Sequence, residues 1–307
     1  MIGHKLLVNS FKALTKSERL AHGYLFVGPE GVGKRLMALG FANFLENPPA
    51  GGGEFAYDEK NPGILGDCLT IGLIDNSIGV DEARKVKQFL AQRPNRSAYR
   101  TVIIDKAEYL TNEAQNALLK ITEEPPASAL LILVVQNPEL LMDTLNSRLQ
   151  KIYFSAVSTN EVKDWLVKGH GVGAVEAERL AKESFGQPGL ALRMFQDEKL
   201  IENLKLAREF LRLDRGSSKE FLKNLVDHPP AGGDFNISDF LDALAMVLAN
   251  LLRNTKFATE YGLSTDIQMK NRNSFTALWH RVLELRRNIS FFPLNPRLQL
   301  QALRNEF

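Results

Sequence analysis

The stretch from residue 28 to residue 35, Gly-Pro-Glu-Gly-Val-Gly-Lys-Arg, has the spacing of a phosphate-binding P-loop in every position but the last. In a P-loop, backbone N–H groups and a helix start surround the phosphates, the lysine reaches the terminal phosphates, and a Ser or Thr hydroxyl holds Mg²⁺. Here Arg35 replaces that hydroxyl, and a guanidinium offers no oxygen ligand. The candidate nucleotide-binding residues are Gly28, Pro29, Gly31, Gly33 and Lys34.

The second motif that nucleotide hydrolysis needs is also incomplete. A predicted strand ends at Asp105, which is suited to assist Mg²⁺, but Lys106 follows where an acidic residue should orient the attacking water. A protonated lysine donates hydrogen bonds and accepts none. We expect the side chain of Glu108, three residues after Asp105, to point away from this site. Asp105 is therefore either a degenerate metal ligand or a solvated or helix-capping carboxylate at a strand end.

Short apolar runs alternate with helical patterns over residues 1–156. The runs are mostly continuous, as is typical of strands covered on both faces, so they predict an α/β P-loop domain with a largely parallel sheet. A helix is expected directly after the P-loop. The predicted strands are Tyr24–Val27, Cys68–Leu73, Thr101–Ile104, Leu130–Val135 and Ile152–Phe154.

The strand signal disappears after residue 156. Residues 157–200 predict a small helical lid domain whose first helix is capped by Ser158 or Thr159. Residues 201–307 predict a third, all-helical domain, because apolar residues recur there every three or four positions. Its most apolar stretch, 240–252, is shorter than a membrane span and is read as a buried helix.

The composition of the chain excludes several classes of protein. Its 307 residues are 44% hydrophobic with a net charge of +2, as in an ordinary soluble globular protein. The single cysteine, Cys68, and the scattered histidines predict no disulfide, no metal site and a reducing, cytoplasmic compartment, and no signal peptide or membrane segment is expected. Residues 205–307 hold 15 Lys and Arg against 11 Asp and Glu, too small an excess to favour a free-standing DNA-binding protein.

Four stretches, in order along residues 3–155, carry a family pattern. They are His22 to Lys34, Ala107 to Thr111, Asn116 to Pro126, and Ser147-Arg148. Together they resemble the AAA+ clamp-loader family. The resemblance is weaker over residues 156–195 and then rests mainly on length and helicity.

The resemblance implies a role for Ser147 and Arg148. They match a Ser-Arg-Cys motif whose arginine is offered to the nucleotide bound by the neighbouring subunit, with Leu149 here in place of the cysteine. An arginine supplied in trans stabilises transition-state charge and is worth about 10³ to 10⁵ in rate. The other interpretation of Arg148 is a cation suited to the dipole at the end of a helix that begins at Pro138.

The resemblance also identifies positions where this chain has lost or altered the family's residues. Asn137 falls where the family keeps a polar sensor for the terminal phosphate, but it precedes Pro138 as an N-cap would. A second sensor, normally an arginine, is replaced by Gly189. The family's zinc-binding cysteines are reduced to Cys68, with a glycine-rich loop over residues 47–66, so no zinc site is carried over.

The departures at Arg35, Lys106 and Gly189 fall on three parts of one hydrolytic site. They indicate a site released from catalysis, and together with the resemblance they imply a non-motor subunit of the bacterial sliding-clamp loader, in a hetero-oligomeric ring with ATPase and delta-type subunits, reaching the clamp and primer-template DNA through that complex. No cofactor is required, and ATP is either bound without turnover or not bound. The alternative is an active clamp-loader ATPase, or another P-loop NTPase, that uses Lys34 and Asp105.

Overall fold

The computed structural model describes residues 2–47, 65–73, 77–213, 217–227, 235–254, 256–263, 272–289 and 295–306. The chain divides into two compact units, Met1–Leu192 and Arg193–Phe307. The predicted domain boundaries at 156 and 200 stay predictions, and most of the predicted loop 47–66 lies outside the described residues.

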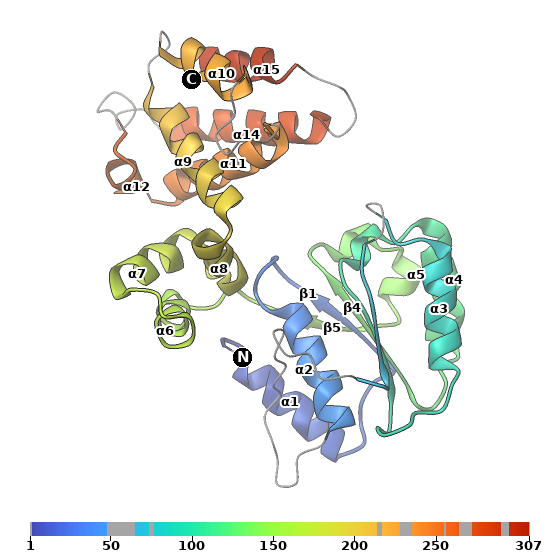
Figure 1. Cartoon of the computed structure of the whole chain (residues 1–307). Coiled ribbons are helices and arrows are strands. Elements are labelled where there is room, and N and C mark those ends of the chain that lie inside the picture. The colour runs from blue at the N-terminus through green and yellow to red at the C-terminus, as the bar shows by residue number, and fades with distance from the viewer. Residues whose placement is uncertain are drawn as a thin grey trace. The chain divides into compact units, whose positions relative to one another are not determined.

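Five strands of the first unit form one parallel sheet in the order β2-β3-β4-β1-β5 (Figure 1). The parallel α/β fold predicted from the apolar runs is thereby confirmed, and the strand ends differ from the predicted ones by at most two residues. β1 lies between β4 and β5, so the loops after β1 and β4 emerge at the same edge of the sheet. The strands are β1 Gly23–Val27, β2 Cys68–Ile71, β3 Arg100–Ile104, β4 Ala129–Val135 and β5 Gln150–Tyr153.

Alternate side chains of the strands pack on opposite faces of the sheet, each covered by two helices (Figure 1). Tyr24 and Phe26 face α1 and α2, whereas Leu25 and Val27 belong to the core under α3 and α4. This two-sided burial is the reason why the strands read as continuous apolar runs. These helices are α1 Lys5–Lys16, α2 Lys34–Glu46, α3 Val80–Leu90 and α4 Asn112–Glu123.

The segment after β4 is broken into short pieces. The 3-10 helix η2 spans Pro138–Leu140 and the helix α5 spans Asp143–Asn146, with extended backbone at the two residues between them. The prediction of one helix starting at Pro138 was therefore wrong. Leu141 is buried, and the N–H of Met142 donates to Gln115 Oε1 at 2.7 Å, so packing against α4 draws this segment out of a helical path.

Three helices follow β5: α6 Thr159–His170, α7 Ala174–Glu183 and α8 Pro188–Gln196. The hydroxyl of Ser158 accepts a hydrogen bond from the N–H of Glu161 at 3.3 Å, which confirms Ser158 as the N-cap of α6.

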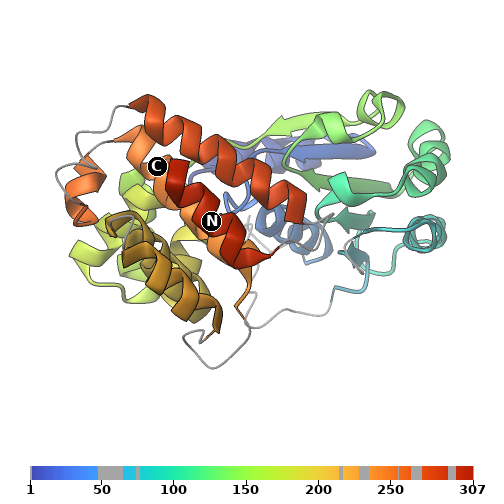
Figure 2. The ribbon, with the colours of Figure 1, turned by 90° about the horizontal axis from the view of Figure 1, so that it is seen from above.

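The secondary-structure elements among the described residues of the second unit are all helices. α11 packs against α9 and α14, and α15 packs against α10 and lies beside α14 (Figure 1; Figure 2). The residues spaced by three or four along α14, from Phe275 to Leu285, are buried as predicted. Among the described residues, every helix falls short of the length or the hydropathy that a membrane span requires. The helices are α9 Glu198–Arg212, α10 Ser217–Asp227, α11 Ile237–Arg253, α12 Lys256–Glu260, α14 Arg272–Ile289 and α15 Pro296–Glu306.

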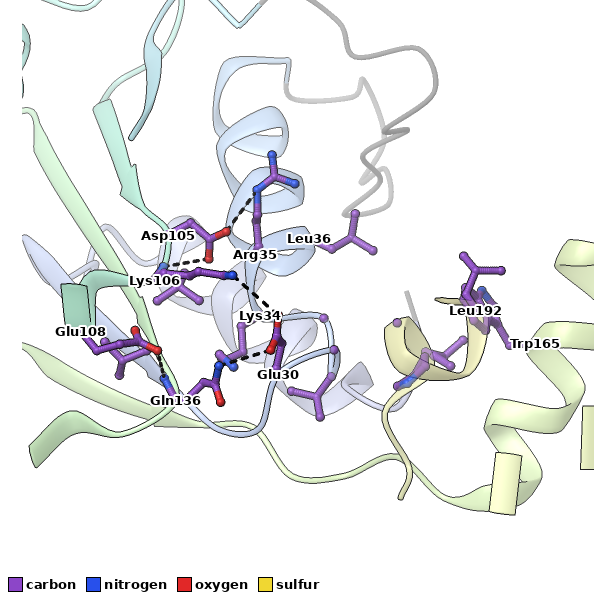
Figure 3. Close-up of a pocket in the computed structure, with 18 residues that line it drawn as sticks. Glu30, Lys34, Arg35, Leu36, Asp105, Lys106, Glu108, Gln136, Trp165 and Leu192 are labelled. Atoms are coloured by element: carbon purple, nitrogen blue, oxygen red, sulfur yellow. Dashed lines mark hydrogen bonds and ion pairs between the residues drawn. The ribbon is translucent and has the colours of Figure 1, made fainter. Parts of the chain in front are cut away.

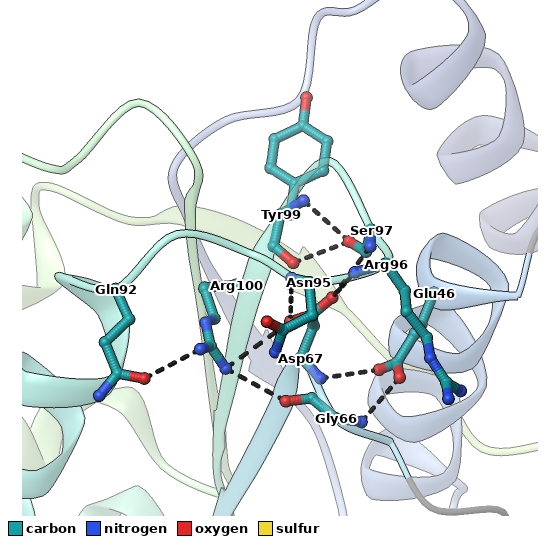
Figure 4. Close-up of polar contacts among 9 residues, drawn as sticks. All are labelled: Glu46, Gly66, Asp67, Gln92, Asn95, Arg96, Ser97, Tyr99 and Arg100. Carbon is teal, nitrogen blue, oxygen red and sulfur yellow. Dashed lines mark hydrogen bonds and ion pairs between the residues drawn. The ribbon is translucent and has the colours of Figure 1, made fainter.

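A buried carboxylate, Asp67, organises the sheet edge opposite β5 (Figure 4). Its oxygens accept from the backbone N–H groups of residues 95, 96 and 97 at 2.7, 2.6 and 2.9 Å, and Arg100 Nη1 lies 3.6 Å from Oδ1. The N–H of Asp67 donates in turn to Glu46 Oε2 at 3.0 Å. These contacts tie the start of β2 to the end of α2 and to the loop before β3.

Candidate functional site

The P-loop stretch has the backbone of a phosphate-binding loop. It joins β1 to α2, and Gly31 and Gly33 adopt φ angles of 74° and 98°. Because only glycine enters this region without strain, these residue types match the loop conformation. The predicted strand-loop-helix context is therefore present.

The lysine of the loop is turned back onto the loop itself. Lys34 Nζ donates to the carbonyl oxygens of Gly28 and Pro29 at 2.5 and 2.6 Å, and the side chain is almost fully buried. Burial lowers the pKa of Lys34, against the opposing influence of the carboxylates of Glu108, Asp105 and Glu30. The ammonium that would reach a terminal phosphate thus serves the loop's own carbonyls.

Arg35 forms an ion pair with Asp105. Arg35 Nε lies 3.6 Å from Asp105 Oδ2, while Asp105 Oδ1 accepts from the N–H of Lys106 at 3.1 Å (Figure 3). In a P-loop enzyme the hydroxyl and the carboxylate at these positions flank Mg²⁺. Here a guanidinium occupies one of the two positions and neutralises the other, so the residues present do not fit a divalent cation.

The predicted orientation of Glu108 was wrong. Lys106 has a left-handed backbone with φ 53°, and the chain then turns through the 3-10 helix η1, Ala107–Tyr109. This turn brings Glu108 back to line the cavity, where its Oε1 accepts from the N–H of Gln136 at 3.2 Å (Figure 3). Glu108 Oε2 is buried without a hydrogen-bond partner among the described residues.

Gln136 and Asn137 follow β4 but have different surroundings. The side chain of Asn137 accepts from the N–H of Glu139 at 2.9 Å and caps η2, the N-cap geometry expected from the following proline. Gln136, which the sequence analysis missed, lines the cavity. Its position directly after a buried strand was the available signal, since side chains at the carboxyl ends of parallel strands face the ligand crevice.

The cavity beside the P-loop has a volume of about 350 Å³. Glu30, Arg35, Asp105 and Lys106 converge on one side, and Trp165 of α6 and Leu192 of α8 lie on the other (Figure 3). The remaining apolar lining comes from Ile2, Val32, Leu36, Val134, Val135 and Pro188. The charged lining balances, because Lys34, Arg35 and Lys106 stand against Glu30, Asp105 and Glu108.

Gly189 contacts the P-loop directly. Its N–H donates to the carbonyl oxygen of Gly31 at 2.8 Å. A Cβ at Gly189 would lie 3.1 Å from Gly31 Cα and 3.2 Å from Gly31 O. A side chain at position 189 would therefore be tightly packed against the backbone of the P-loop while α8 contacts the loop in this way.

Arg148 does not line this cavity. It follows α5, and its Nη2 lies 2.8 Å from Glu123 Oε1 at the end of α4, while Nη1 donates to the carbonyl oxygen of Thr144. About a third of the side chain is exposed. The hydroxyl of Ser147 donates to Thr144 O at 3.3 Å. The structure thus brings together Lys34, Asp105 and the loop glycines, but keeps the Ser147-Arg148 pair apart from them.

His4, which the sequence analysis did not select, contacts the backbone of the P-loop. Its Nε2 lies 2.9 Å from the carbonyl oxygen of Val32, and its ring contacts Phe154 edge-on at a centroid distance of 4.9 Å. Burial lowers the pKa of His4, although the hydrogen bond to Val32 and the charge of Glu161 raise it in part.

We expect this buried imidazole to make folding sensitive to mild acid. The unfolded chain takes up the proton near the ordinary pKa of 6.5, and the folded chain does so only at lower pH, so stability is lost as pH falls below about 6.5. Thermal unfolding of wild type and His4→Gln between pH 7.5 and 5.5 measures the effect. Over this pH range the melting temperature of the wild type should fall further than that of the variant. Equal decreases would show that His4 is not the source of the acid sensitivity.

In a comparison with known protein families, residues 3–158 match the family described as DNA polymerase III, delta subunit. The delta' subunit of DNA polymerase III from Escherichia coli K12 is 33% identical over 123 residues, which are 40% of this chain and 37% of that protein. The tau subunit from Bacillus subtilis is 29% identical over 188 residues, or 60% of this chain and 32% of that protein.

A solved structure shares the fold. The DNA polymerase III gamma subunit-related protein of Thermotoga maritima superposes with a TM-score of 0.57 at 20% identity, covering 96% of this chain and 99% of that one. The matches with curated relatives are shorter and span between 27% and 56% of the relatives' lengths.

Proposed function

The chain belongs to the family described as DNA polymerase III, delta subunit, and we propose that it is a clamp-loader subunit without ATPase activity of its own. The predicted resemblance to the clamp-loader family is confirmed by the family match and by the identity with delta' subunits. The subunit would complete the ATP site of a neighbouring motor subunit by supplying Arg148.

The observation that carries the proposal is the internal neutralisation of the nucleotide site. Lys34 is held by two loop carbonyls, Arg35 is paired with Asp105, and Lys106 Nζ lies 3.9 Å from Glu30 Oε1. A triphosphate carries several negative charges and needs an excess of positive charge to bind. A site whose cations already have anionic or carbonyl partners supplies little of it.

The position of Arg148 supports the second half of the proposal. Its guanidinium is partly exposed and lies outside the cavity beside the P-loop, where the nucleotide-site residues Lys34, Arg35 and Asp105 are gathered. An arginine acts in trans when it is presented at a surface that a neighbour's nucleotide can reach. We assign Ser147 to the same surface turn.

The remaining elements take structural roles in this proposal. Helices α6 to α8 form the lid, and the hydrogen bond between Gly189 and Gly31 keeps it on the P-loop. The helices of the second unit would form the collar that assembles the hetero-oligomeric ring with ATPase and delta-type subunits. The sliding clamp and primer-template DNA would be engaged through that ring, with no cofactor required by this chain.

Purified chain should hydrolyse ATP at no more than a trace rate, and calorimetry should show no Mg²⁺-dependent ATP binding. Addition of the chain to motor and delta-type subunits from the same organism should complete a ring with DNA-stimulated ATPase activity. Mg²⁺-dependent hydrolysis by the isolated chain, abolished by Lys34→Ala, would instead establish the active-ATPase alternative.

Lys34→Ala is expected to leave the DNA-stimulated ATPase rate of the ring within about twofold of wild type, because the ammonium serves the loop and not a substrate. The free energy of unfolding of the variant should be lower by about 1–3 kcal/mol, since two hydrogen bonds from a charged, buried group are lost. Alanine at the P-loop lysine of the motor subunit is the matched control and should abolish turnover. A severe loading defect in folded Lys34→Ala would show that nucleotide binding at this site matters.

A further inference from the structure

Two elements distant from each other in the sequence hold the guanidinium of Arg148. Glu123, the last residue of α4, contacts Nη2, and the carbonyl oxygen of Thr144 in α5 contacts Nη1. The two terminal nitrogens therefore have different partners, which restricts rotation of the planar group about the end of the side chain. A guanidinium has five N–H donors, so the group keeps donors for a third, anionic partner.

Fold stability does not explain the ion pair. The Arg148 and Glu123 side chains are 34% and 49% exposed, and exposed pairs contribute only about 0–1 kcal/mol. Loss of Glu123 should accordingly leave the fold intact. The pair does restrict the Arg148 side chain to one orientation. A free arginine side chain carries about 2 kcal/mol of rotamer entropy, which is lost when it binds a phosphate.

We propose that Glu123 is a positioning residue for Arg148, holding its guanidinium in the orientation in which it meets the neighbouring subunit's nucleotide. This inference rests on the proposed trans function of Arg148. Charge stabilisation in a transition state depends on donors that are already in place, and small displacements of such groups cost rate and not binding. Glu123 would therefore act on turnover through Arg148 without contacting the nucleotide itself.

The test uses a reconstituted ring whose other ATP sites carry P-loop lysine substitutions, with Glu123→Ala, Glu123→Gln or Arg148→Ala in this chain, so that only the site completed by Arg148 turns over ATP. Glu123→Ala should lower the DNA-stimulated kcat for ATP about three- to tenfold with KM little changed. Glu123→Gln should retain most of the rate, because the amide oxygen still accepts from Nη2. The double variant Glu123→Ala/Arg148→Ala should be no slower than Arg148→Ala alone.

Glu124→Ala is the matched control. Glu124 is the next residue, is also exposed, and carries the same charge, so its loss tests the effect of removing a carboxylate from this surface. It should leave kcat unchanged, and all variants should assemble and melt as the wild type does.

Each other outcome has a definite meaning. Wild-type rate for Glu123→Ala beside a strong defect for Arg148→Ala would overturn the positioning role and leave the proposed function standing. Faster turnover in both Glu123 variants would show that the carboxylate restrains the arginine, which also overturns it. Unchanged turnover in Arg148→Ala would contradict both the proposed function and this inference.

Discussion

Arg148→Ala is expected to slow ATP turnover at the one neighbouring site that this chain completes by on the order of 10³-fold, the lower range of effects measured for arginines supplied in trans. Ring assembly should persist, because the partners of the side chain among the described residues, Glu123 and the Thr144 carbonyl, belong to this chain. The measurement is DNA-stimulated turnover in a ring whose other ATP sites carry P-loop lysine substitutions. In that ring the measured turnover comes from a single ATP site.

Arg148→Lys is the informative companion to this variant. Lysine keeps the positive charge but not the planar fork of donors that contacts two oxygens at once. It should restore only a small part of the rate if Arg148 contacts phosphate. Full activity of Arg148→Ala in the single-site ring would return this residue to the alternative interpretation, a cation at the end of a short helix.

Asp67→Asn is expected to destabilise the first unit by about 3–5 kcal/mol, the cost of removing one partner from a buried ion pair. Its carboxylate is 1% exposed and accepts from three consecutive N–H groups (Figure 4). An amide in its place turns one acceptor into a donor facing those donors, and it leaves the charge of Arg100 buried without its counter-ion. The loss is large against the 5–15 kcal/mol that stabilises a typical domain.

The two tryptophans make this prediction measurable in the whole chain. Trp165 lies in the first unit and Trp279 in the second. Urea unfolding in a Trp279→Phe background therefore leaves Trp165 as the reporter of the first unit. Asp81→Asn is the control, because Asp81 pairs with Arg84 at 75% exposure and should cost less than about 1 kcal/mol. Equal midpoints for both variants would show that the network is not needed for stability.

The pH dependence of this network has a defined sign. Burial alone raises the pKa of Asp67, but the N–H groups of residues 95–97 and the Arg100 guanidinium lower it more, so the net shift is downward. The stabilisation is therefore fully present above the ordinary pKa of 3.8 and is lost as pH falls through the lower, folded-state pKa. Asp67→Asn should remove that part of the acid sensitivity.

Side chains that act within their own segment were predictable from the sequence. Apolar runs identified all five strands, and central ones such as Leu130–Val135 are continuous because a strand covered on both faces has no polar side. Ser158 and Asn137 were recognisable as N-caps, since capping joins residues two or three positions apart. The missing hydroxyl at Arg35 was likewise a matter of residue type alone.

Contacts between distant segments were not predictable in this way. The turn at Lys106 carries Glu108 back into the cavity, and the burial of Leu141 breaks the expected helix. Gly31 and Gly189 are separated by more than 150 residues, yet their backbones approach closely enough to form a hydrogen bond. No local pattern encodes such an approach, because it depends on how α8 packs onto the P-loop.

The amino-acid sequence was enough to identify a P-loop scaffold with hydrolytic residues missing at three positions, because residue type and local spacing decide which ligands a site offers. The partners of the remaining cations became known from the folded chain. Lys34 is directed to the loop carbonyls, Arg35 to Asp105, and Arg148 to Glu123. A flexible, charged side chain takes the partner that folding brings within reach, and that partner is set by the packing of elements far apart in the sequence.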